Sequence, residues 1–74
     1  MYSRIKDLRE DSNLPQREIS LQLNCSQQAY SNYELGRRDV PTAMLIRIAQ
    51  LHKTSVDYVL GLTDIRQPYP KSER

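Results

Sequence analysis

The chain has 74 residues, of which 38% are hydrophobic and 27% charged, with neither Trp nor Phe. A chain this short forms one small domain, which buries only about 60% of its unfolded surface. The formal net charge of +2 permits nucleic-acid binding without requiring it. A single cysteine excludes an internal disulfide framework, and there is no signal-peptide pattern or run of about 20 apolar residues. We therefore expect a cytoplasmic protein with no membrane segment.

Apolar residues at helical spacing predict a first helix over residues 3–12, with Ile5 and Leu8 on its buried side. Pro15 disfavours helical geometry in the residue before it and therefore separates this helix from the next. A second helix is predicted over residues 16–23. The chain thus opens with two short amphipathic helices.

The third predicted helix lies between two boundary residues. The Ser26 hydroxyl can cap its first turn, and Gly36 suits a left-handed stop. Asn24 tolerates positive φ and can reverse the chain before this helix, and Cys25 is small and apolar enough to fill the corner. Two helices joined by so short a turn cross steeply, which is typical of a helix-turn-helix motif.

The third helix has two unlike faces. Tyr30, Tyr33 and Glu34 share the face that should pack against the rest of the domain. We expect the tyrosine rings to lie in the core, because aromatic stacking platforms belong to proteins that bind single strands. The opposite face displays amide and hydroxyl groups and one leucine, from Gln27, Gln28, Ser31, Asn32 and Leu35.

Two more helices complete the pattern. A fourth should begin after a cap at Thr42 and run to about His52, where an imidazolium would suit the helix dipole. A fifth is predicted over residues 56–60, with either Thr54 or Ser55 as its cap. Five helices without a strand signal predict an all-α fold.

The composition changes after the fifth helix. Residues 64–74 carry Pro68 and Pro70 and several charged side chains, so we expect a flexible or extended tail. Residues 1–63 should form the folded domain.

Residues 4–63 resemble the Cro/cI-type helix-turn-helix domain of the XRE family of bacterial and phage regulators. The match lies in the opening Gln16-x-Glu18, the helix start Ser26-Gln27-Gln28, and the exit Glu34-x-Gly36-Arg37-Arg38-x-x-Pro41. The resemblance implies a compact five-helix bundle, the lambda repressor-like DNA-binding domain. It also implies double-stranded DNA as the partner.

Base reading is expected from the polar face of the third helix. A glutamine can bond N6 and N7 of adenine at once, so Gln27 and Gln28 at a helix N-terminus suit a recognition helix. Lambdoid phage repressors carry a Gln-Gln pair at the matching positions and use it on operator bases. Ser31 and Asn32, one turn further, are second candidates. The alternative is an exposed helix face that is simply rich in glutamine.

Phosphate contacts are expected around this face. Gln16 matches the backbone-binding glutamine of the family, beside a helix N-terminus whose N–H groups would face a phosphate. Arg17, Arg37 and Arg38 are the charged candidates, against the alternative of a solvated charged surface. Asp39 departs from the family pattern, because the matching stretch in many relatives is basic. Its carboxylate would repel a nearby phosphate.

Two further observations concern structure and chemistry. Arg9 and Glu34 match a pair that forms an internal salt bridge in the family and ties the first helix to the end of the third. Cys25 and His52 have no partner at metal-ligand spacing, and the chain shows no nucleophile–base set or phosphate-cradling loop. We therefore expect no enzyme activity, metal, cofactor or small-molecule ligand.

The leading hypothesis is a sequence-specific transcriptional regulator of double-stranded DNA, with a repressor as the favoured form. A single recognition helix covers few base pairs, so we expect a homodimer on a palindromic operator. The alternative is an antitoxin or anti-regulator that uses the helix-turn-helix scaffold mainly for protein–protein interaction.

Overall fold

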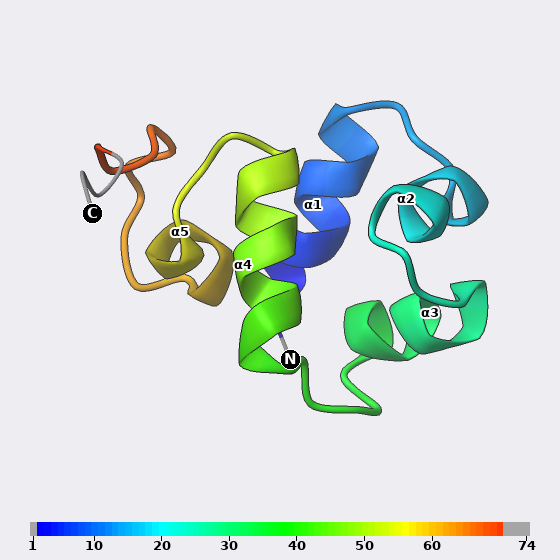
Figure 1. Cartoon of the computed structure of the whole chain (residues 1–74). Coiled ribbons are helices and arrows are strands. Elements are labelled where there is room, and N and C mark those ends of the chain that lie inside the picture. The colour runs from blue at the N-terminus through cyan, green and yellow to red at the C-terminus, as the bar shows by residue number, and fades with distance from the viewer. Residues whose placement is uncertain (1, 71–74) are drawn as a thin grey trace.

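The computed structural model describes residues 2–70, in which the regular secondary structure is five α-helices. They are α1 (Ser3–Asp11), α2 (Gln16–Gln22), α3 (Gln27–Leu35), α4 (Thr42–Leu51) and α5 (Val56–Leu60). Helix α2 packs on α3, α4 packs on α5, and α1 contacts both α3 and α5. Figure 1 shows α2 and α3 on one side of α4 and α5 on the other. The predicted all-α, five-helix fold is confirmed.

The ends of α3 are those that the sequence predicts. The Ser26 hydroxyl accepts a hydrogen bond from the Ala29 N–H at 3.1 Å, which satisfies a free backbone donor of the first turn. Gly36 ends the helix in the left-handed conformation, with φ of 72°. Asn24 also has positive φ, 57°, and so allows the reversal before the helix. Short-range backbone chemistry therefore determines where α3 begins and ends.

The predicted cap of α4 is wrong. The carbonyl of Pro41 already accepts the N–H of Leu45 at 3.0 Å, so Pro41 is the N-cap and Thr42 is the first helical residue. The Thr42 hydroxyl therefore makes no capping hydrogen bond. A proline is tolerated here because this position needs no backbone N–H donor.

The two candidate caps of α5 have different roles. The Ser55 hydroxyl accepts from the Tyr58 N–H at 3.0 Å and caps the helix. The Thr54 hydroxyl instead donates to the carbonyl oxygen of Arg66 at 2.6 Å. Thr54 thus holds the chain that follows α5 against the end of α4.

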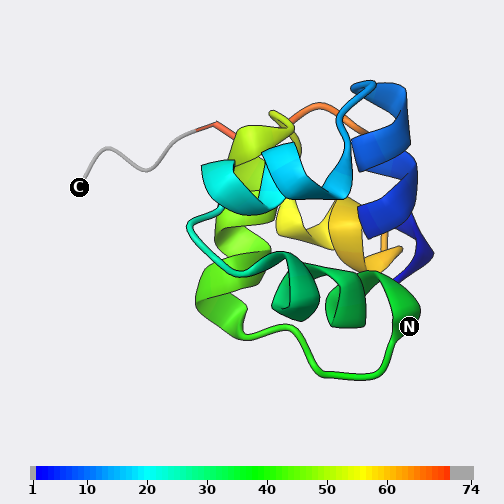
Figure 2. The same cartoon turned by 90° about the vertical axis from the view of Figure 1, so that its right-hand side faces the viewer.

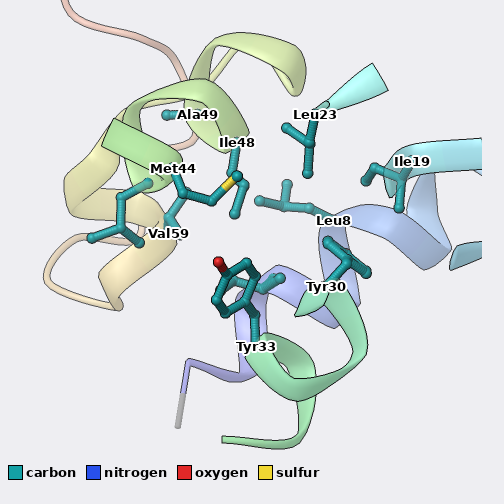
Figure 3. Close-up of a cluster of buried hydrophobic side chains, with 11 residues drawn as sticks. Leu8, Ile19, Leu23, Tyr30, Tyr33, Met44, Ile48, Ala49 and Val59 are labelled. Carbon is teal, nitrogen blue, oxygen red and sulfur yellow. The ribbon is translucent and has the colours of Figure 1, made fainter. Parts of the chain in front are cut away.

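All five helices contribute to one hydrophobic core. Figure 3 shows buried side chains of these helices converging, among them Leu8, Ile48 and Val59. Tyr30 is fully buried and Tyr33 is 5% exposed, so both rings pack in the core as predicted. Within residues 2–70, the buried hydrophobic residues of this core are Ile5, Leu8, Ile19, Leu23, Tyr30, Tyr33, Met44, Leu45, Ile48, Ala49 and Val59.

The chain that follows α5 lies against the domain without regular secondary structure. The Arg4 guanidinium forms a salt bridge with Asp64 at 2.7 Å. The Tyr69 hydroxyl donates to the Asp57 carboxylate, also at 2.7 Å. Residues of the first part of the predicted tail are therefore bonded to α1 and α5. Residues 71–74 lie outside the described residues.

A buried ion pair joins α1 to the last turn of α3. Arg9 Nε donates to Glu34 Oε2 at 2.6 Å, and Arg9 Nη2 donates to Glu34 Oε1 at 3.2 Å. The side chains are 14% and 4% exposed. Arg9 Nη1 also donates to the carbonyl of Leu14 at 2.9 Å. The pair thus anchors three segments, namely α1, the loop before α2, and α3.

The surroundings of Glu34 favour its charged form. Burial opposes ionisation, but the hydrogen bonds that Arg9 and Gln16 donate outweigh it, so the pKa of Glu34 is lowered. Hydrogen bonding to Glu34 likewise raises the pKa of Arg9. The phenol of Tyr30 stays neutral, because burial and the adjacent carboxylate raise its pKa far above the ordinary value.

His52 corrects the expectation of an imidazolium at the end of α4. The residue is the C-cap of α4 but is only 9% exposed. Its Nδ1 lies 3.4 Å from the Ser12 hydroxyl, and its buried Nε2 has no hydrogen-bond partner within residues 2–70. Burial, with the positive charge of Arg66, lowers the pKa of His52. Desolvation of the ring therefore favours the neutral imidazole at the end of α4.

Replacing Glu34 by Ala should lower the free energy of unfolding by about 3 kcal/mol, because Arg9 would remain as an unpaired, largely buried charge. Urea unfolding followed by helical circular dichroism measures the change. The matched control is Glu18→Ala, which removes an exposed carboxylate and should cost less than about 1 kcal/mol. Equal stability of the Glu34→Ala variant and the parent chain would contradict a structural role for the pair.

The buried His52 should make stability depend on pH. Its folded pKa lies below the ordinary value of 6.5, so the unfolded chain binds the proton more readily. The stability that this pKa difference contributes is fully present above the ordinary pKa of 6.5. It is lost as the pH falls from about 7 towards the folded pKa of His52. Urea unfolding at several pH values should show this decline, and His52→Asn should flatten it. A decline of the same size in the variant would rule out His52 as its source.

Candidate nucleic-acid interface

Helices α2 and α3 form a helix-turn-helix pair. The C-cap of α2 is Leu23, and α3 begins at Gln27 after the reversal at Asn24. Figure 2 shows the two helices facing the viewer, with the connection from α3 to α4 passing below them. Cys25 is half-buried at the corner and packs against the core. Burial raises the pKa of its thiol, so Cys25 acts as a small apolar residue of the turn.

The outer face of α3 presents the residues predicted to read bases. Gln27 and Gln28 are exposed and follow directly after the Ser26 cap. Ser31 and Asn32 are half-buried one turn further along. Because the opposite face of α3 is buried in the core, the helix cannot rotate to hide these side chains. Two amides, each with a donor and an acceptor, are thus held at the N-terminal end of an anchored helix.

Three arginines lie at the two ends of this pair of helices. Arg17 is in the first turn of α2, and Arg37 and Arg38 directly follow α3. All three are exposed, and none forms an ion pair with another residue of the described part of the chain. Asp39 is also exposed and adds a negative charge to the same loop. The positive charges of the three arginines are therefore available to an anionic partner.

Gln16 has a contact that the sequence analysis missed. It is the first residue of α2 and is half-buried, and its Nε2 donates to Glu34 Oε1 at 3.0 Å. The sequence pattern predicts a phosphate contact for Gln16 and an ion pair with Arg9 for Glu34, and nothing in it connects Gln16 with Glu34. The residues are 18 positions apart, so no helical periodicity indicates the contact. It exists because the start of α2 meets the end of α3.

A further basic side chain was also missed. Arg47 is exposed on α4, and its charge acts on the Cys25 thiol at the turn before α3. The broad apolar stripe of α4 is typical of a nearly buried helix, and this obscures its exposed polar positions. The available signal was the spacing of the core residues Leu45, Ile48 and Ala49, which leaves Arg47 outside the apolar stripe.

An apolar hollow of about 690 Å³ lies elsewhere, between α4, α5 and the chain after α5. Ile46, Val56 and Tyr69 are among its lining residues, and α2 and α3 contribute none.

Within residues 2–70, no three His, Cys, Asp or Glu side chains are grouped so that they could hold a metal ion. The helices of this part of the chain are too short or too polar to cross a bilayer.

Comparison with known proteins agrees with this geometry. The family model described as helix-turn-helix matches residues 5–59. The chain is 36% identical over 75 residues to the HTH-type transcriptional regulator YobD of Bacillus subtilis, covering all of this chain and 65% of that protein. It is 34% identical over 62 residues to the HTH-type transcriptional regulator ImmR of Bacillus subtilis, covering 84% of this chain and 49% of that protein.

The chain thus spans less than two thirds of the length of either relative. No solved structure matches it. The family match nevertheless covers α2, the turn, α3, and every residue of the packed core. The chain therefore belongs to the XRE-type helix-turn-helix family.

Proposed function

We propose that the chain binds double-stranded DNA in a sequence-specific manner, as a transcriptional regulator of the bacterial or phage cytoplasm. The observation that carries this proposal is the exposed pair Gln27 and Gln28 at the N-terminal end of α3. The major groove admits an α-helix, and a glutamine amide matches the edge of adenine at N6 and N7. Ser31 and Asn32 extend the same face towards bases or sugars.

Phosphate contacts would hold α3 in the groove. Gln16 and the free N–H groups at the start of α2 supply neutral donors, and Arg17, Arg37 and Arg38 supply positive charge. Asp39 opposes them in the loop after α3. Contacts of this kind set the position and orientation of the domain on the duplex, whereas the glutamines supply the sequence preference.

A homodimer on a palindromic operator is the assembly that we favour. A single helix reads few base pairs, and two copies can bind half-sites about 34–36 Å apart on the same side of the duplex. Repression would follow where such a site overlaps a promoter. Gel filtration of the chain alone and with operator DNA tests the dimer.

A second candidate function is the binding of a protein partner, as in an antitoxin or anti-regulator. The observation in its favour is the exposure of two large apolar side chains on the helix-turn-helix pair, Leu21 at 66% and Leu35 at 52%. Single exposed leucines are common on protein surfaces, so this observation carries less than the glutamine pair. Stoichiometric co-purification of a partner, without DNA retention at low salt, would favour this function.

The two classes of DNA contact should respond differently to substitution. Gln28→Ala should cost about 1–3 kcal/mol on a preferred duplex and relax the base preference at one position, because it removes a base contact. Arg37→Ala should weaken binding to all sequences alike and reduce the dependence on salt, because it removes a phosphate contact. Fluorescence anisotropy measures both effects on a duplex selected from a randomised pool and on a scrambled duplex, at several salt concentrations.

Gln22→Ala is the matched control, because Gln22 is an exposed glutamine at the far end of α2. It should leave the affinity unchanged on both duplexes. If Gln28→Ala reduced binding to selected and scrambled DNA equally, direct reading of a base by Gln28 would be refuted. If the parent chain bound no duplex at low salt, the proposed function itself would fail.

A further inference from the structure

We infer that Glu34 is a positioning residue for the phosphate contact of Gln16. Its buried carboxylate holds the Gln16 amide at the start of α2, with one amide hydrogen left for the DNA backbone. The inference rests on the proposed function, since it names the device by which one of the proposed contacts is oriented. It gives Glu34 a role in binding in addition to its ion pair with Arg9.

The geometry begins with the orientation of the carboxylate. Arg9 bonds both of its oxygens, with Nε 2.6 Å from Oε2 and Nη2 3.2 Å from Oε1. The Glu34 side chain is 4% exposed, so the carboxylate has little room to rotate. Its Oε1 also accepts from Gln16 Nε2 at 3.0 Å. The direction of the Gln16 amide is therefore set by a group that the core holds in place.

Gln16 keeps further hydrogen-bonding capacity. A glutamine amide has two N–H donors and one carbonyl acceptor, and the bond to Glu34 uses one donor. No other hydrogen bond of the Gln16 side chain occurs within residues 2–70. The second N–H can therefore donate to a phosphate oxygen. Because the amide is planar, the bond to the carboxylate also sets the direction of this second N–H.

The charges in this region are compatible with a nearby phosphate. A carboxylate alone would repel the DNA backbone, but the Arg9 guanidinium balances the charge of Glu34 at hydrogen-bond distance. The lowered pKa of Glu34 keeps it ionised, and so able to accept from Gln16, at neutral pH. Gln16 can therefore bind a phosphate without a net negative group behind it.

Gln16 differs in this respect from the other proposed contacts. Gln27 and Gln28 are exposed and their side chains make no hydrogen bond within the described residues, and the same is true of Arg37. The side chains of Gln27, Gln28 and Arg37 would each lose rotational freedom on binding DNA. The Gln16 side chain has already lost that freedom in the free domain, because it is bonded to Glu34. Fixing one such side chain in advance changes the affinity by about two- to tenfold.

The first test is the effect of Gln16→Ala in two backgrounds. Arg9→Met with Glu34→Leu replaces the ion pair by apolar side chains of similar size, which leaves no unpaired buried charge. Gln16→Ala should weaken duplex binding about two- to tenfold in the parent chain and less than about twofold in this background. Gln22→Ala should change neither. An equal loss in both backgrounds overturns the inference and leaves the proposed function intact.

The second test needs neither DNA nor a variant. In nuclear magnetic resonance spectra of the parent chain, the two Nε2 protons of Gln16 should be shifted from the positions of an exposed glutamine amide, unlike those of Gln27 and Gln28. Their shifts should follow the titration of Glu34, below the ordinary carboxyl pKa of 4.5. Signals at the positions of an exposed amide that ignore this titration overturn the inference. The result stands apart from the proposed function, whose own failure is the absence of any duplex binding.

Discussion

The ion pair of Arg9 and Glu34 is the interaction on which the arrangement of the helix-turn-helix depends. Removal of two charges from water is costly, and this pair offsets the cost with two hydrogen bonds between the partners and others to Leu14 and Gln16. These bonds connect α1, the loop before α2, the start of α2 and the end of α3. The directional bonds of the pair thus add to the packing of the core by joining segments that are far apart in the sequence.

The two faces of α3 explain how a domain this small can hold a polar surface in a fixed position. Tyr30, Tyr33 and Glu34 are buried, so the helix is held along the whole of its inner face. Gln27 and Gln28 face solvent on a segment that cannot retreat into the domain. The capped first turn adds to this rigidity, because the Ser26 hydroxyl closes the helix just before the glutamines. Side chains on rigid helices keep their positions better than side chains on loops.

Much of the fold and part of the candidate site could be predicted from local patterns. The α3 boundaries depend on Ser26 and Gly36, and the turn depends on the tolerance of Asn24 for positive φ. These preferences act over a few residues, so they are visible in the sequence. The exposure of Gln27 and Gln28 likewise follows from helical periodicity. The predicted cap at Thr42 failed because a proline carbonyl one residue earlier accepts the first helical bond.

The sequence by itself determined five helices, their approximate ends, the helix-turn-helix and the side chains that α3 presents to solvent. Each of these follows from spacing and backbone preference within one segment. Only the tertiary structure decided that Gln16 bonds Glu34, that Thr54 holds the chain after α5, and that His52 is buried with a lowered pKa. Those outcomes depend on which distant segments meet and on how much water they exclude. The spacing of residues within one segment determines neither of these.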